Sequence, residues 1–193
     1  VDHRVGWALL FMIETGAIAA VSITFAEYTL RLLGREGVNA IPLAVAAIVT
    51  LLAGFGFKIV LAPFHQWAPD TYEGAPTPVT AYMAVVAKTG GFAALLRVFI
   101  SAFPSLSQDL VPVLSTLVIL TLVIGNLAAL AQKNIKRMFA YSSISHAGFI
   151  MMAFVTYGQE GVYADSVAAV LYYLLAFAVT SFGSWAVVIA LEK

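Results

Sequence analysis

Two lysines lie inside strongly apolar stretches of this sequence, where a charged side chain needs a chemical explanation. Lys58 stands within the run Phe55–Leu61, five residues before Pro63, and Lys88 lies close to the midpoint of the run Pro78–Leu96. A charged lysine at the centre of a membrane helix costs about 2.5–3.5 kcal/mol, so ionisable residues in such runs usually have a function. Both lysines are therefore predicted to gain and lose a proton.

The two lysines differ in how well a purely structural role explains them. The side chain of Lys58 has the alternative of extending along its helix to the membrane interface. Lys88 has ten uncharged residues before it and eight after it, up to Arg97, so its side chain has little chance of reaching water in this way. Gly90 and Gly91 follow Lys88, so a second helix is expected to approach closely there.

His146 and Glu14 are the remaining candidates for proton chemistry. His146 lies among three serines in the segment Tyr141–Gly148. Because histidine changes charge near neutral pH, His146 is predicted either to relay protons or to bond a neighbouring helix as a neutral ring. Glu14 lies about one third of the way into the first apolar run. It is predicted to be a modulator of a buried lysine, a carboxyl group held neutral by burial, or a partner for another subunit's helix.

The composition excludes several classes of function. Of the 193 residues, 62% are hydrophobic and only 10% are charged, with a net charge of zero. A soluble domain has about 25% charged residues, and a nucleic-acid-binding protein has a basic surplus. The chain has no cysteine and only three scattered histidines, so we expect no disulfide, iron–sulfur cluster or metal site. No glycine-rich nucleotide-binding motif is present, and no cofactor is expected in this chain.

The candidate residues must be positioned by transmembrane helices, since a span needs about 20 apolar residues. The segments are too long and too uniformly apolar for the alternating strands of a membrane β-barrel. We therefore predict an all-α fold, a polytopic bundle in which residues 1–193 form a single transmembrane domain. The six predicted spans are Val5–Thr29, Ile41–Phe64, Pro78–Leu96, Leu110–Ala131, Met138–Tyr157 and Ser166–Leu191.

The second span is predicted to be a broken helix. The segment Ile41–Glu73 has 33 residues, which would make a straight helix of about 50 Å. Pro63 removes a helical N–H and clashes with the carbonyl of Ile59. One half is expected to end near Ile59 and the other to cover about Phe64–Tyr72. Broken helices mark the working sites of transporters.

Residues at the ends of the spans indicate how the chain lies in the membrane. The positive-inside rule favours a cytoplasmic N-terminus and a cytoplasmic 132–137 loop, with five basic residues against three. Aromatic residues near the span ends, Trp67, Tyr72 and Trp185 among them, are interpreted as interface anchors. Because the chain ends at Lys193 directly after an apolar run, it is expected to be a piece of a longer membrane protein.

Two long segments resemble one known family. The run GFKIVLAPFHQWAPDTYEGAPTPV from Gly56 to Val79, and the block NIKRMFAYSSISHAG from Asn134 to Gly148, are similar to subunit N of respiratory complex I. This subunit is one of the antiporter-like membrane subunits of NADH-quinone oxidoreductase. The resemblance covers roughly residues 41–190.

The resemblance implies a fold and a set of roles. The family fold has about fourteen helices in two inverted repeats, of which this chain would supply roughly helices six to eleven. Lys58 matches the key lysine of the broken seventh helix, and Lys88 matches a second lysine on the eighth. The essential glutamate of the family lies on its fifth helix, so its role does not transfer to Glu14. A further family lysine, on the twelfth helix, would lie beyond Lys193.

The resemblance also implies a function, a location and partners. The chain is expected to belong to a proton-translocating subunit without a redox centre, inactive alone, with NAD, FMN, iron–sulfur clusters and quinone in partner subunits. Its partners would be other complex I membrane subunits, the lipid bilayer and protons, with no nucleic acid. A bacterial plasma membrane is favoured over an organelle inner or thylakoid membrane. The alternatives are a stand-alone or Mrp-type cation/proton antiporter subunit and a structural or assembly subunit.

Overall fold

The computed structural model of the chain describes residues 40–102, 107–156 and 161–192. The first predicted span, Val5–Thr29, lies outside these residues, and so does Glu14. All regular elements of the described residues are helical, which confirms the all-α prediction. They are α2 (Ala40–Ile59), α3 (Trp67–Gly74), α4 (Thr77–Tyr82), the π-helix η1 (Met83–Ala87), α5 (Lys88–Ala102), α6 (Ser107–Leu130), α7 (Ile135–Thr156) and α8 (Tyr163–Leu191).

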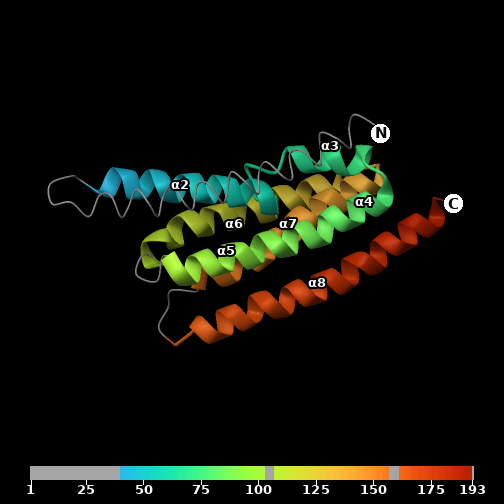
Figure 1. Cartoon of the computed structure of the whole chain (residues 1–193). Helices are drawn as coiled ribbons and strands as arrows, with labels where there is room; N and C mark the ends of the chain where they lie inside the picture. The colour runs from blue at the N-terminus through green and yellow to red at the C-terminus, as the bar shows by residue number, and fades with distance from the viewer. Residues whose placement is uncertain (1–39, 103–106, 157–160, 193) are drawn as a thin grey trace.

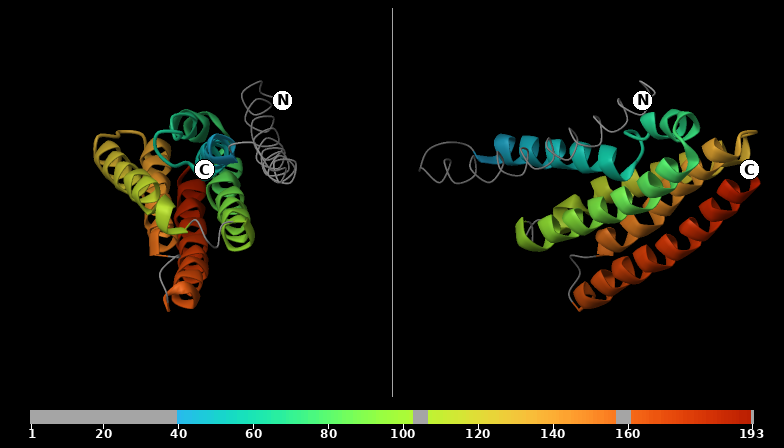
Figure 2. Two further views of the ribbon diagram at one scale, coloured as in Figure 1. Left: turned by 90° about the vertical axis from the view of Figure 1, so that its left-hand side faces the viewer. Right: turned by 45° about the vertical axis from the view of Figure 1, so that its right-hand side comes forward.

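The helices form an elongated bundle. Figures 1 and 2 show α2 and α3 along one side, α8 along the opposite side, and α4 to α7 between them. The described residues contain four helical segments long and apolar enough to cross a membrane. They agree with the last four predicted spans, so the chain is a multi-pass membrane protein. The four segments are Thr77–Val98, Leu110–Leu130, Ile135–Thr156 and Tyr163–Leu191.

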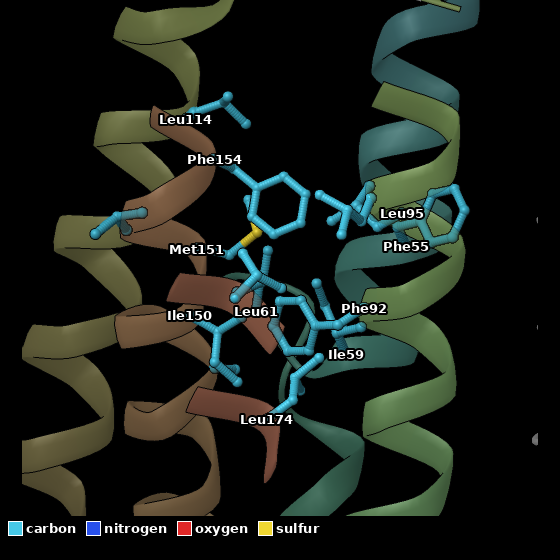
Figure 3. Packing of buried hydrophobic residues seen from close by; sticks show 14 of the residues in the cluster. Phe55, Ile59, Leu61, Phe92, Leu95, Leu114, Ile150, Met151, Phe154 and Leu174 are labelled. Atoms are coloured by element: carbon cyan, nitrogen blue, oxygen red, sulfur yellow. The ribbon is translucent and has the colours of Figure 1, made fainter. Parts of the chain in front are cut away.

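The centre of the bundle is filled by large apolar side chains. Figure 3 shows Ile59 and Phe92 opposite Ile150, Met151 and Phe154 of α7. Each of these five side chains is almost completely buried. This core fixes the end of α2 and the middle of α5 against α7, and it therefore sets the positions of Lys58 and Lys88, which lie on those two helices.

Helices α6 and α7 approach each other closely at Gly125. A Cβ atom placed on Gly125 would lie 2.8 Å from the backbone nitrogen of Ser145. Small residues allow membrane helices to pack at short distances. A larger residue would not fit at position 125, so the glycine allows α6 to pack directly on the serine-rich segment of α7.

Candidate functional site

The predicted helix break is present at Pro63. Helix α2 ends at Ile59, residues 60–66 are not helical, and α3 begins at Trp67 rather than near Phe64. Val60 has a φ of 66° and the Ala62–Pro63 peptide bond is cis. A positive φ is disfavoured for a β-branched residue, and such conformations persist where the surrounding structure holds them, often at functional sites.

Neighbouring side chains and turns satisfy several backbone groups at and beside the break. The Ala62 N–H donates to the hydroxyl of Thr121 on α6 at 3.0 Å, in a buried position. The Leu61 N–H donates to the Gly56 carbonyl at 2.7 Å. The indole N–H of Trp67 donates to the Phe57 carbonyl at 3.1 Å. Non-helical backbone is tolerated at membrane depth only with such partners, so these bonds keep the break in one conformation.

Lys58 lies in the last turn of α2, directly before the break, and its side chain is half-buried. Its stem packs against α5, because a Cβ atom on Gly91 would lie 3.3 Å from Lys58 Cγ and 2.7 Å from Ile59 Cγ2. Gly91 is three residues after Lys88, on the same helix. The two lysine-bearing helices therefore meet at Gly91. A Cβ on Gly90 would meet nothing within 4 Å, so the predicted close approach involves only the second glycine.

Lys88 is buried, with 1% of its surface exposed. Its Nζ donates to the carbonyl oxygen and to the hydroxyl oxygen of Ser143 on α7, each at 2.5 Å. The Nζ also lies 5.9 Å from the centre of the Phe177 ring on α8. Among the described residues, no carboxylate forms an ion pair with Lys88. Within the described residues, the polar contacts of this amine are thus two neutral oxygens of Ser143, with one aromatic ring nearby.

A π-helical turn, η1, directly precedes Lys88. It adds one residue to the turn, so without it Lys88 would be rotated by about 100° around the helix axis. The hydroxyl of Thr89, in the first turn of α5, donates to the Val85 carbonyl of this π-turn at 2.8 Å. Such π-turns occur frequently at functional sites. The sequence gives no signal for it, because residues 82–87 include neither proline nor glycine.

His146 shares a polar cavity with the partner of Lys88. The cavity has a volume of about 290 Å³, enough for several water molecules. His146 lies three residues after Ser143, so both project from the same face of α7. Its Nδ1 is 2.8 Å from the Tyr173 hydroxyl. The polar lining residues are Ser142, Ser143, His146, Thr180, Ser181 and Ser184.

Two aromatic residues interpreted as interface anchors are buried in the bundle instead. Tyr72 has 1% and Trp185 has 3% of its surface exposed, and their rings meet edge to face with centroids 6.4 Å apart. The interface interpretation is wrong for both residues. It rested on their position near the ends of apolar runs, where a buried aromatic and an anchor look the same in sequence.

Ion pairs tie α3 to the start of α7. Arg137 binds Asp70, and it binds Glu73 at 2.9 Å. The Asn134 side chain also donates to Glu73, at 2.9 Å. More than 60 residues separate these partners in the chain, so no local pattern in the sequence connects them. The cluster fixes the outer face of α3 on α7.

A second polar contact joins the end of α8 to α4 and α7. Glu192 accepts a hydrogen bond from the Thr77 hydroxyl at 2.5 Å and pairs with Lys136 at 3.3 Å. The hydrogen bond from Thr77, together with the nearby Lys136 ammonium, lowers the pKa of the Glu192 carboxyl. The contact orders the end of the helix that forms one wall of the cavity.

The Gly91 contact gives a testable prediction. Replacing Gly91 by alanine would force Ile59, whose branched side chain is stiff, away from α5. We expect Gly91→Ala to destabilise the bundle by about 1–3 kcal/mol, the usual cost of overpacking, and to lower its midpoint of thermal unfolding in detergent. Gly90→Ala is the matched control and should leave the midpoint unchanged or slightly higher. Equal midpoints for the two variants would contradict the contact.

The fold and the site together define a class of protein. A multi-pass bundle with one broken helix, and with a buried lysine beside a polar cavity, is typical of membrane proteins that move ions or protons. No group of three or more histidine, aspartate or glutamate residues that could hold a metal ion occurs in the described part of the chain.

Comparisons with known proteins identify the family. Residues 4–193 match the sequence model described as NADH:quinone oxidoreductase/Mrp antiporter, TM, and the chain belongs to this family. It is 47% identical over 191 residues to NADH-quinone oxidoreductase subunit N 2 of Roseiflexus castenholzii, covering 97% of this chain and 37% of the relative. The resemblance to subunit N is thereby confirmed. The chain spans only about a third of the length of such relatives.

Two solved structures are similar to the chain. One is a chain of respiratory complex I from Thermus thermophilus with bound aureothin, with 43% identity, a TM-score of 0.57, and coverage of 88% of this chain and 38% of that one. The other is from the Mrp complex of a Dietzia species, with 17% identity, a TM-score of 0.76, and coverage of 95% and 34%. At this identity the Mrp likeness shows the fold alone.

Proposed function

We propose that the chain is part of a proton-translocating membrane subunit of NADH:quinone oxidoreductase, in which Lys58, Lys88 and His146 relay protons. The observation that carries the proposal is the buried Lys88 amine, bound to Ser143 beside a polar cavity. A lysine in such a place is costly without a function. The identity to relatives named subunit N supports the choice of complex.

The proposed mechanism uses the two lysines in turn. A signal from distant quinone chemistry moves a carboxylate towards or away from Lys58. Pairing stabilises the ammonium form and loads a proton, whereas separation destabilises it and drives the proton to Lys88. From Lys88 the proton passes along the cavity that Ser143 and His146 line. Glu14 remains a candidate for modulating a buried lysine.

The proposal includes the surroundings of the subunit. NAD, FMN, iron–sulfur clusters and quinone would be bound by partner subunits, and the chain itself would hold no redox centre. Its neighbours would be other membrane subunits of the complex and the lipid of a bacterial plasma membrane. The cytoplasmic side would be that of the 132–137 loop, as the distribution of basic residues predicts.

A native gel tests this function. The full-length protein, extracted in mild detergent, should migrate in a large band that contains iron and stains for NADH dehydrogenase activity. A small band without iron or activity, reproduced in a gentler detergent, would contradict the proposal and favour a stand-alone or Mrp-type antiporter. A large active band would favour a structural or assembly subunit if the same complex still pumped protons after Lys58 and Lys88 were replaced by alanine.

A further inference from the structure

Tyr173 of α8 holds one nitrogen of the His146 ring. Its hydroxyl oxygen lies 2.8 Å from His146 Nδ1. The planes of the two rings are inclined by 56°, with centroids 5.9 Å apart. The Tyr173 ring also stacks with Phe149 of α7, at a centroid distance of 6.3 Å. Among the described residues, His146 is the one hydrogen-bond partner of the Tyr173 hydroxyl, so this hydroxyl serves to orient the histidine ring.

The two nitrogens of His146 have different surroundings. His146 lines the polar cavity, whereas Tyr173 is not among the described residues that line it. Tyr173 packs instead against the apolar core that contains Ile150 and Leu174. The two nitrogens of an imidazole ring point in different directions, so a ring that is held by Tyr173 through Nδ1 has Nε2 left for the cavity.

Phe177 places the histidine ring beside the lysine site. It follows Tyr173 by one turn of α8, and its ring centroid lies 5.1 Å from that of His146. The Nζ of Lys88 lies 5.9 Å from the centre of the same Phe177 ring. Two aromatic residues, one turn apart on α8, therefore hold His146, and one of them is also a neighbour of Lys88.

The charge state that a proton relay requires decides how the Tyr173 hydroxyl is used. A protonated histidine donates from both ring nitrogens, whereas a neutral one donates from a single nitrogen. The charged His146 ring therefore needs an acceptor at Nδ1, and the Tyr173 oxygen is in place to accept this bond. The bond made by one ring nitrogen also determines which nitrogen is protonated in the neutral ring. If Nδ1 keeps its proton throughout, Nε2 alone gains and loses the relayed proton, and the ring does not have to rotate.

We propose that Tyr173 is a positioning residue for His146, which keeps a proton on Nδ1 and leaves Nε2 to exchange protons with the cavity. This inference rests on the proposed function of His146 as a proton relay. The Tyr173 hydroxyl has no second hydrogen-bond partner among the described residues, so the relay does not continue past it. His146 takes a proton from the cavity at Nε2 and returns it to the cavity from the same nitrogen.

Tyr173→Phe in the assembled complex, with the full-length subunit, tests the inference, because it keeps the ring and removes only the hydroxyl. We expect the number of protons pumped per NADH oxidised to fall about two- to tenfold, the range that corresponds to one hydrogen bond. Nitrogen NMR of the complex, with isotope-labelled histidine in this subunit, reads the tautomer of His146 directly. The neutral ring should carry its proton on Nδ1 in the wild type and shift towards Nε2 in Tyr173→Phe. A role of Tyr173 in packing alone would leave this distribution unchanged.

Tyr172→Phe is the matched control, since Tyr172 is the preceding residue of α8 and is 75% exposed. It should pump like the wild type and keep the wild-type histidine signals. His146→Gln identifies the signals of His146 by their loss, and it distinguishes the two ways in which the inference can fail. If His146→Gln pumps normally, both the relay role of His146 and the role of Tyr173 are overturned. If His146→Gln loses pumping while Tyr173→Phe keeps either the wild-type ratio or the wild-type tautomer, only the role of Tyr173 is overturned.

Discussion

Replacing Lys88 by alanine is expected to abolish proton pumping while the complex still assembles. In the proposed relay this amine carries the proton, and its hydrogen-bond partner in the buried site is Ser143. Alanine carries no ionisable group, so the step between Lys58 and the cavity would be lost. We expect pumping to fall at least about tenfold, in keeping with the 10²–10⁴-fold contribution of a positioned acid–base group. Proton uptake by vesicles that contain the complex, with NADH as the driver, measures this loss.

A second substitution separates the charge of Lys88 from its ability to release a proton. Lys88→Arg keeps a positive charge, but a guanidinium does not deprotonate in proteins. It should therefore fail to pump almost as completely as Lys88→Ala. Lys133→Ala removes an exposed lysine from the α6–α7 loop and is the control that should pump normally. Full pumping by Lys88→Arg would show that a fixed charge suffices and would rule out proton release at this position.

The helical fold and the helix break could be predicted because local physics decides them. Long uncharged runs leave only helices as spanning structures, and Pro63 cannot continue a helix. Lys58 and Lys88 were found in the same way, since their apolar flanks make them conspicuous. The break still differs in detail from its prediction, because residues 60–66 form a longer interruption than a proline alone requires.

The rest of the site depends on contacts between distant segments, which the sequence does not display. Ser143 is one serine among three, and only the position of Lys88 of α5 against α7 selects it as the hydrogen-bond partner. Gly90 and Gly91 are equivalent in sequence, but only Gly91 faces α2. The π-turn before Lys88 has no local composition that predicts it. The interface-anchor interpretation of Tyr72 is wrong because burial near a helix end depends on the other helices that pack there, and the sequence does not display them.

Removing the charge of Lys58 is expected to be the other substitution with a large effect. Lys58 lies in the last turn before the break, and its stem packs on Gly91. Alanine would remove both the amine and this packing, so Lys58→Met is the sharper variant, because its unbranched apolar side chain retains most of the stem. We expect Lys58→Met to reduce NADH-driven pumping about tenfold or more, since in the proposed relay the group that loads the proton would be missing.

The pair Lys58→Met and Lys58→Ala also separates proton transfer from packing. If Lys58 acts as a proton carrier, both variants should lose pumping, and only Lys58→Ala should lower the midpoint of thermal unfolding as well. If Lys58→Met pumps like the wild type and Lys58→Ala does not, the role of Lys58 lies in its packing on α5. The relay would then begin at Lys88. Among the described residues it is the one lysine that is completely buried, and it lies beside a polar cavity.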